Sequence, residues 1–300
     1  MRIVLLSLGS AGSCSGVRVP VLACRDALRQ GGAEVDVVTA ESDQELDAAV
    51  ESTLPGSNGV ESEPNGAESR LVVAATSDGE LRAVLRRMVR RYAPPPSKRP
   101  AGLPADRTIP DLPPIGVLPL DSSRPPELVT RLQLPRTPEQ TAAAVLGGNV
   151  RRFDLFRTDS GSVTLHGALI GGSGEQGQAA AWQGKIEVDD TVLSDGAEPL
   201  LACAIANSSG HAVIDDLPLV GETDPTDGLI DVGVVVPVVR QGLLRRKVRV
   251  EVRRSRGRAV SITPRDPVAY LDDGVAGTLG RKRSWWAERT AWAVYVPTAP

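Results

Sequence analysis

The sequence contains few of the residues that build metal centres and disulfide frameworks. Three of its 300 residues are cysteines and two are histidines. Cys14, Cys24 and Cys203 are too few and too scattered for a zinc site or a disulfide framework. His166 and His211 have no cysteine or histidine partner at ligand spacing, so we expect structural or surface histidines. This cysteine content favours a reduced, cytoplasmic protein.

An excess of positive charge and a long apolar run are also lacking. The formal net charge is −3, which excludes a generally basic nucleic-acid-binding protein and limits any affinity for anions to a local patch. The apolar run at residues 1–8 is followed by glycine and serine, so it is too short for a signal peptide or a membrane-spanning helix. We therefore expect any contact with a membrane to be peripheral.

Apolar runs and helical patterns alternate along the first part of the chain. Strands are expected at residues 3–6, 35–38 and 71–75, and helices at residues 19–30, 44–50 and 79–92. Short buried strands separated by helices are typical of a parallel sheet that is covered on both faces. Residues 1–136 are therefore predicted to form a Rossmann-like α/β domain.

The remaining chain has the patterns of β-strands. Apolar and charged residues alternate strictly at residues 247–253, and residues 232–239 form a more continuous apolar run. The first pattern indicates a half-buried strand and the second a buried one. After a helix at residues 138–147, we expect a β-rich antiparallel sandwich domain. This second domain is predicted to span residues 137–300.

Two irregular stretches interrupt the first domain. Residues 53–68 are rich in proline, glycine, serine and asparagine, and we expect them to form a solvated loop. Residues 93–114 include three consecutive prolines and cannot form a helix or a central strand. A connection of this length is either disordered or functional.

Several short motifs follow the predicted strands in a fixed order. They are Thr76-Ser-Asp-Gly-Glu80, Gly116-Val-Leu-Pro-Leu-Asp-Ser-Ser123, Arg152-Phe-Asp-Leu155, Asp224-Pro-Thr-Asp-Gly-Leu-Ile-Asp-Val232 and Leu271-Asp-Asp-Gly-Val275. Because it carries these motifs in this order, the chain resembles the diacylglycerol kinase catalytic-domain family, which includes bacterial lipid kinases and sphingosine kinases. The resemblance runs along nearly the whole chain and implies an α/β domain like that of NAD kinases and diacylglycerol kinases.

The resemblance also implies roles for particular residues. An active member would use ATP and magnesium and would transfer a phosphoryl group to a lipid hydroxyl. Asp227 and the carbonyl of Leu229 would hold a magnesium ion, and Asp273 would act as the general base. The residues that would bind the nucleotide are Ser7, Gly9, Thr76, Ser77, Asp78, Gly79, Glu80, Asp121 and Ser122.

The nucleotide-binding loops depart from the family pattern. Thr76 and Ser77 replace paired glycines, Glu80 replaces a threonine, Asp121 replaces a glycine, and Val275 replaces a glutamate. Phosphate binding needs backbone amides without a blocking Cβ and a helix N-terminus without a carboxylate. We therefore expect weak nucleotide affinity. A catalytically inactive pseudokinase that binds a lipid or a protein partner is the alternative function.

Other classes of protein and partner stay open. An NAD-kinase-like protein is one alternative, because NAD kinases share the Gly-Gly-Asp-Gly loop with the diacylglycerol kinase family. A glycosyltransferase is another, because residues 1–10 and 31–39 are similar to the start of a two-domain glycosyltransferase. Residues 245–258 carry eight basic residues and one acid, which indicates a solvated surface or a patch for anionic lipid headgroups. A homodimer is also open, and no nucleic-acid partner is expected.

Overall fold

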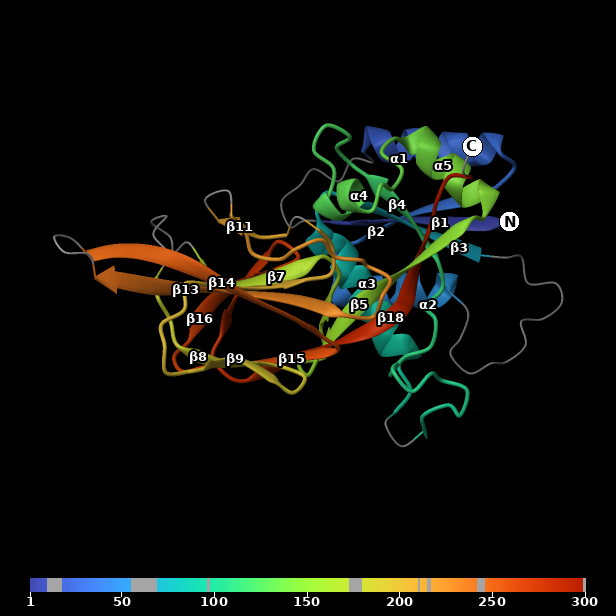
Figure 1. Ribbon diagram of the computed structural model, residues 1–300. Coiled ribbons are helices and arrows are strands. Elements are labelled where there is room, and N and C mark those ends of the chain that lie inside the picture. The colour runs from blue at the N-terminus through green and yellow to red at the C-terminus, as the bar shows by residue number, and fades with distance from the viewer. Residues whose placement is uncertain are drawn as a thin grey trace. The chain divides into compact units, whose positions relative to one another are not determined.

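The computed structural model describes residues 1–9, 18–54, 69–95, 98–172, 180–209, 211–214, 217–241 and 246–298 (Figure 1). The chain forms two compact units, Met1–Phe153 with Thr290–Pro300, and Asp154–Arg289. The expected boundary near residue 136 differs from this division, because the first unit also holds the following helix and the last segment of the chain. No helix within the described ranges is long and apolar enough to cross a membrane.

The first unit contains a parallel sheet with the strand order β2-β1-β3-β4, and β4 also pairs in parallel with the last part of β18. The strands are β1 (Arg2–Leu8), β2 (Glu34–Ala40), β3 (Ser69–Ala75), β4 (Ile115–Pro119) and β18 (Arg283–Tyr295). The helices are α1 (Val19–Gln30), α2 (Asp43–Thr53), α3 (Asp78–Tyr92), α4 (Glu127–Arg131) and α5 (Pro138–Gly147). This confirms the α/β architecture expected from the alternating patterns.

Helices α1 and α5 lie side by side over one face of this sheet, as Figure 1 shows. Val21, Cys24 and Leu28 of α1 and Val145 of α5 share one buried cluster with apolar side chains of β1, β3 and β4. Burial of a large aliphatic side chain stabilises a fold by about 1.5–3 kcal/mol. The apolar face of α5 therefore keeps this helix with the first unit.

Helices α2 and α3 pack against each other and are joined by an arginine. The side chain of Arg87 on α3 is 8% exposed and pairs with Asp43 and Asp47 of α2. Arg91 donates to the backbone carbonyls of Glu51 and Leu54 at the end of α2. The basic end of α3 therefore has an internal structural role.

Helices α2 and α5 begin with the same kind of cap. In α2, the Ser42 hydroxyl accepts the amide of Glu45, and the Glu45 carboxylate accepts the amide of Glu41 at 2.6 Å. In α5, Thr137 and Gln140 make the equivalent pair of bonds, with Arg136 as the donor to Gln140. These caps are similar to capping boxes, except that the side chain of the third helical residue bonds to the amide of the residue before the N-cap.

The two irregular stretches differ in how far they can be described. The expected loop at residues 53–68 lies mainly outside the described residues. The described part of residues 93–114 contains neither an α-helix nor a strand. Ile109 and Leu112 are fully buried there, and the amide of Leu112 donates to the carbonyl of Ala291 at 2.8 Å. This connection is therefore ordered by packing.

The second unit contains an antiparallel sheet with the order β14-β13-β10-β7-β16-β17. Its strands are β7 (Gly167–Gly171), β10 (Ala202–Ala206), β13 (Ile230–Gln241), β14 (Arg246–Gly257), β16 (Val268–Asp272) and β17 (Val275–Leu279). A second layer contains β8 (Gly184–Val188), β9 (Thr191–Asp195), β15 (Ala259–Pro264) and the first part of β18, which pair in the order β18-β15-β8-β9. The remaining strands are β5 (Val150–Thr158), whose first residues belong to the first unit, β6 (Val163–Thr164), β11 (Val213–Ile214) and β12 (Leu217–Pro218).

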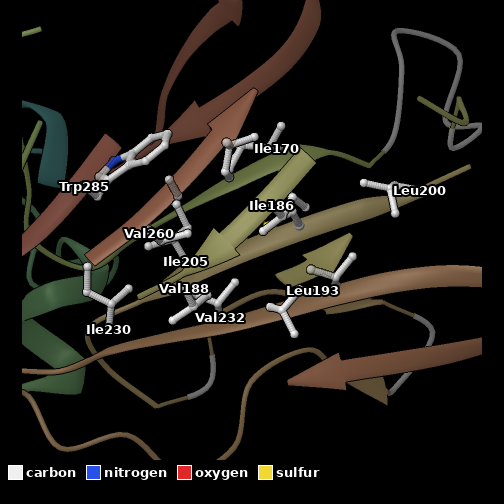
Figure 2. Close-up of a cluster of buried hydrophobic side chains, with 14 of the residues drawn as sticks. Ile170, Ile186, Val188, Leu193, Leu200, Ile205, Ile230, Val232, Val260 and Trp285 are labelled. Atoms are coloured by element: carbon white, nitrogen blue, oxygen red, sulfur yellow. The ribbon is translucent and has the colours of Figure 1, made fainter. Parts of the chain in front are cut away.

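Side chains from the two layers form one core in the second unit (Figure 2). Ile205 and Val232 come from the first sheet, whereas Ile186, Val260 and Trp285 come from the second layer. Inward-facing side chains of two sheets that meet in this way define a β-sandwich. The predicted antiparallel, β-rich second part of the chain is therefore confirmed.

Candidate functional site

The strands of the first unit bring the predicted nucleotide-binding residues to one edge of the sheet. Strands β1, β3 and β4 are parallel neighbours, with Ser7 opposite Ala74 and Ala75 opposite Pro119. The segments that follow these strands therefore leave the same edge. They contain Gly9, residues 76–80 and residues 121–122. The carboxyl edge of a parallel sheet is where α/β proteins usually bind ligands.

The loop before α3 is closed by a carboxylate of its own helix. Glu80 lies in the first turn of α3, and its carboxylate accepts the amide of Thr76 at 2.6 Å. The residue before the helix is Ser77, so residues 77–80 have the Ser-x-x-Glu pattern that also begins α2. A phosphate would need these amides as donors. Glu80 places an internal anion at the positive end of the helix instead.

Asp78 holds a neighbouring helix. Its side chain is buried, and its two carboxylate oxygens accept the amide of Leu128 at 3.1 and 3.3 Å. Leu128 lies at the start of α4. Asp78 of the retained Asp-Gly pair thus makes a structural contact that the resemblance to the family did not suggest.

The loop after β4 also folds onto its own carboxylate. Asp121 accepts the amide and the hydroxyl of Ser123 at 2.9 and 2.6 Å, and the amide of Arg124 at 3.2 Å. These hydrogen bonds, first that from the Ser123 hydroxyl, hold the pKa of Asp121 below its usual value. An ionised carboxylate is therefore fixed beside Ser122, where the resemblance implies phosphate.

The first predicted contact residues lie at the end of β1. The Ser7 hydroxyl is 3.1 Å from the hydroxyl of Thr39, and the amide of Gly9 donates to the carbonyl of Ala40 at 2.9 Å. Both residues therefore bond to β2 or its end. The remaining Gly/Ser-rich turn, residues 10–17, lies outside the described residues.

Asp273 is the predicted general base, and the structure places it in a buried turn. Its side chain is 3% exposed. The carboxylate accepts the backbone amides of Leu165, His166 and Gly167 at 2.8, 2.8 and 3.2 Å. Asp273 and Gly274 have φ angles of 48° and 77°, which form the tight turn between β16 and β17. The carboxylate thereby fixes the turn before β7, and its role as a base stays a prediction.

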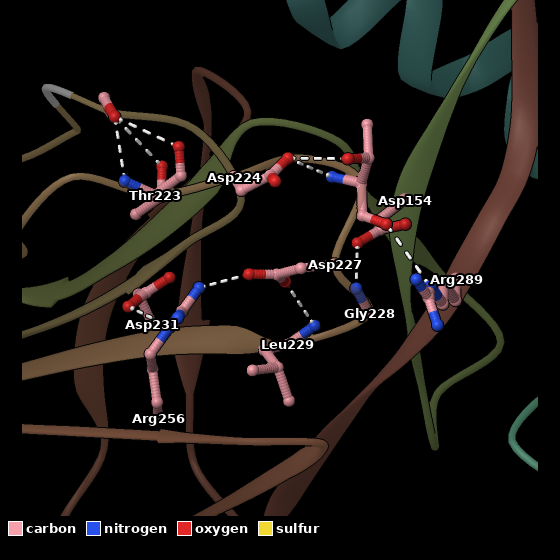
Figure 3. Close-up of polar contacts among 11 residues, drawn as sticks. Asp154, Thr223, Asp224, Asp227, Gly228, Leu229, Asp231, Arg256 and Arg289 are labelled. Atoms are coloured by element: carbon pink, nitrogen blue, oxygen red, sulfur yellow. Dashed lines mark hydrogen bonds and ion pairs between the residues drawn. The ribbon is translucent and has the colours of Figure 1, made fainter.

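The Asp-Gly segment before β13 is pinned by a second buried aspartate (Figure 3). Asp154 is fully buried, and its carboxylate accepts the amide of Gly228 at 2.6 Å. The amide of Asp154 donates to the carbonyl of Pro225 at 2.7 Å. Gly228 has φ of 78°, and a Cβ there would lie 3.0 Å from the side chain of Arg289. The backbone angle therefore favours glycine, and a Cβ would also require a small shift of the Arg289 side chain.

Arg256 occupies the position next to Asp227 where the resemblance implies magnesium. Its guanidinium pairs with Asp227, and its Nε lies 2.9 Å from a carboxylate oxygen of Asp231. The other oxygen of Asp227 accepts the amide of Leu229 at 2.8 Å. Within the described ranges, no group of three or more His, Cys, Asp or Glu side chains is arranged to hold a metal ion. The residues present therefore do not fit a bound divalent cation.

Three of the eight basic residues in the run at residues 245–258 contact neighbouring groups of the second unit. Arg253 pairs with Glu198 and Glu251, and Arg254 donates to the carbonyls of Pro218 and Leu219. Together with Arg256, three arginines of the predicted basic patch thus contact neighbouring groups of the same chain. Carboxylates partly neutralise the charges of Arg253 and Arg256, whereas Arg254 keeps its full charge. Whether the run is a solvated surface or a patch for lipid headgroups stays a prediction.

Comparisons with known proteins find similarity in structure only. No family model matches the sequence, and no curated protein matches it. Three solved structures from Bacillus anthracis str. Sterne, one described as a diacylglycerol kinase and two as putative ones, superpose with TM-scores of 0.62, 0.66 and 0.64. Each match covers 98% of this chain and 96% of the other at 11% identity. The chain therefore has the fold of these proteins, as the sequence resemblance implied.

Proposed function

We propose that this chain is a lipid-kinase-like protein that binds a lipid or a protein partner and does not transfer phosphate. The observation that carries the proposal is the hydrogen bond from the Thr76 amide to the Glu80 carboxylate. The same fold in proteins described as diacylglycerol kinases supports kinase ancestry. An internally closed phosphate loop supports loss of the activity.

The electrostatic cost of binding a nucleotide at this edge supports the proposal. Glu80 and Asp121 both place carboxylates in the loops that would face phosphate oxygens. Two like charges about 4 Å apart repel by on the order of 1 to 4 kcal/mol, between the values for water and for a protein surface. That repulsion weakens binding by about one to three powers of ten. Relative to the roughly 1 μM to 1 mM that enzymes usually show for their substrates, we therefore expect a nucleotide dissociation constant in the millimolar range or weaker.

A phosphoryl-transfer assay tests the proposal. The chain is incubated with radiolabelled ATP, magnesium and diacylglycerol in mixed micelles, and labelled lipid is counted against a protein-free control. We expect no transfer above that control from a well-folded protein. Turnover in the range of about 1–100 s⁻¹ that is usual for kinases would contradict the proposal.

An active lipid kinase is the second candidate function, and the retention of the whole fold favours it. In that case Asp273 would be the general base, and Asp273→Asn should lower transfer by roughly 10²- to 10⁴-fold. The variant must be folded at the assay temperature, as circular dichroism can show, because Asp273 also holds backbone amides and its loss is expected to lower stability. Undiminished transfer by a folded variant would exclude Asp273 as the base.

Vesicle flotation distinguishes the two kinds of partner. Binding to an anionic lipid surface should depend on vesicle charge and weaken at high salt. Because three arginines of β14 already contact groups of the chain, we expect little binding to anionic vesicles at physiological salt. Strong, salt-sensitive flotation would instead identify the basic run as a lipid-binding surface.

A further inference from the structure

The pairing of β13 and β14 sets one arginine against two aspartates. Asp231 and Arg256 are direct partners in the antiparallel register, so their side chains point to the same face of the sheet. Asp227 reaches the same guanidinium from the preceding turn. Figure 3 shows the Arg256 side chain between the two carboxylates. Three charged groups from a loop and two strands thus converge at one point of the second unit.

The loop that carries Asp227 is held in place independently of Arg256. The carboxylate of Asp154 fixes the amide of Gly228, and Asp224 caps the turn by accepting the amide and the hydroxyl of Thr226 at 3.0 and 2.7 Å. Asp227 is therefore presented towards β14 by a preformed turn. A bridging cation has only to join this turn to the end of β14.

A guanidinium is suited to that bridging position. It is planar, always charged and carries several donors in a fixed fork, so it can contact two carboxylates at once. The Asp231 side chain is 13% exposed, and burial raises the pKa of its carboxyl group while Arg256 acts in the opposite direction. Removing the guanidinium would leave two neighbouring carboxylates without their shared positive charge.

We propose that Arg256 replaces a divalent cation in this chain, so that the turn at residues 224–229 is held to β14 without any metal. A magnesium ion at the same point would need the carboxylate oxygens that Arg256 occupies, and the two positive charges would repel each other. The inference concerns the second unit alone and does not depend on the proposed function.

Thermal unfolding of the full chain in EDTA and in about 10 mM MgCl₂ or CaCl₂ tests this inference, since sites with few ligands bind these ions in the millimolar range. The wild type should unfold at the same temperature in all three conditions. Arg256→Ala should unfold about 2–4 °C lower in EDTA, and either ion should recover most of that loss by entering between Asp227 and Asp231. The double variant Arg256→Ala/Asp231→Asn should lose the recovery.

Arg254→Ala is the matched control. Arg254 lies two residues before Arg256 in β14 but donates to the carbonyls of Pro218 and Leu219, so its loss should not create a cation site. Should Arg256→Ala fail to fold, Arg256→Gln takes its place, because it keeps most of the side-chain length and removes the positive charge between Asp227 and Asp231. An ion-dependent rise for the wild type, or a response of the Arg256 variant no larger than that of Arg254→Ala, would overturn the proposal.

Discussion

The loop before α3 and the turn before β13 expose groups of opposite polarity, and in each a side chain of the chain itself contacts those groups. In the first, the backbone amide of Thr76 donates to the carboxylate of Glu80, which lies in the helix that follows the loop. In the second, carboxylates that could bind a cation receive a guanidinium from the neighbouring strand, Arg256. Each position where the resemblance implies a ligand is thus filled by a side chain of the chain itself.

The hydrogen bonds that hold the two regions differ in burial and therefore in their expected contribution to stability. The α3 cap shares with α2 and α5 only the bond from the third helical residue back to the preceding loop, because Ser77 makes no side-chain cap bond, and it lies at an exposed loop. The turn before β13 rests on the fully buried carboxylate of Asp154. Helix caps are worth about 0.5–2 kcal/mol, whereas buried charged groups that hold amides are worth more. We therefore expect the first unit to tolerate changes at its loops better than the second.

The largest expected effect is on the buried turn of the second unit. Asp273→Ala removes the acceptor of three backbone amides, at Leu165, His166 and Gly167. Because buried donors without an acceptor are costly, the free energy of unfolding should fall by about 3–5 kcal/mol. Denaturant unfolding measures the loss, and Asp273→Asn, which keeps one oxygen, should lose less. A loss below about 1 kcal/mol for Asp273→Ala would contradict the expectation that the second unit tolerates changes at its turns less well than the first.

A smaller effect is expected at the helix caps of the first unit. Glu80→Ala and Glu45→Ala each remove the carboxylate that closes a Ser-x-x-Glu cap. Both variants should lower the free energy of unfolding by about 0.5–2 kcal/mol. A much larger loss for Glu80→Ala alone would show that its carboxylate does more in the fold than cap a helix.

The smallest expected effect is a difference in titration between two aspartates. Hydrogen bonds from Ser123 lower the pKa of Asp121, so its contribution to stability is present above the ordinary value of 3.8 and is lost as the pH falls through the lowered pKa. Burial raises the pKa of Asp231, so its linked contribution is present below 3.8 and is lost as the pH rises through the raised pKa. Carbon NMR of the two carboxyl groups should show Asp121 titrating below 3.8 and Asp231 above it. The reverse order would contradict the arrangement of both sites.

Much of the fold could be predicted because periodicity reports burial. The alternating apolar runs and helices of the first part, and the strict alternation at residues 247–253, each define an element without tertiary information. The periodicity of a single element does not show which of the two units that element packs with. The apolar face of α5 and the last part of β18 pack with the first unit, which explains why a boundary at residue 136 missed them.

The site was predictable in part. The edge of the sheet where Ser7, Thr76 and Asp121 gather follows from parallel strands alone. The Ser-x-x-Glu pattern at residues 77–80 was also visible and is typical of a capped helix, although only the Glu80 bond is formed and Ser77 makes no side-chain cap bond. The pairing of Arg256 with Asp231 depends on strand register, which the pattern of one strand does not specify.

Calorimetry with Mg-ATP tests the central claim most directly. Wild type, Glu80→Ala and the matched control Glu45→Ala are titrated side by side at one ionic strength. We expect the wild type and Glu45→Ala to bind with dissociation constants of about 1 mM or weaker, and Glu80→Ala to bind about tenfold more tightly because the helix N-terminus loses its internal anion. A micromolar dissociation constant for the wild type, or equal affinities for all three proteins, would contradict a nucleotide loop closed by Glu80.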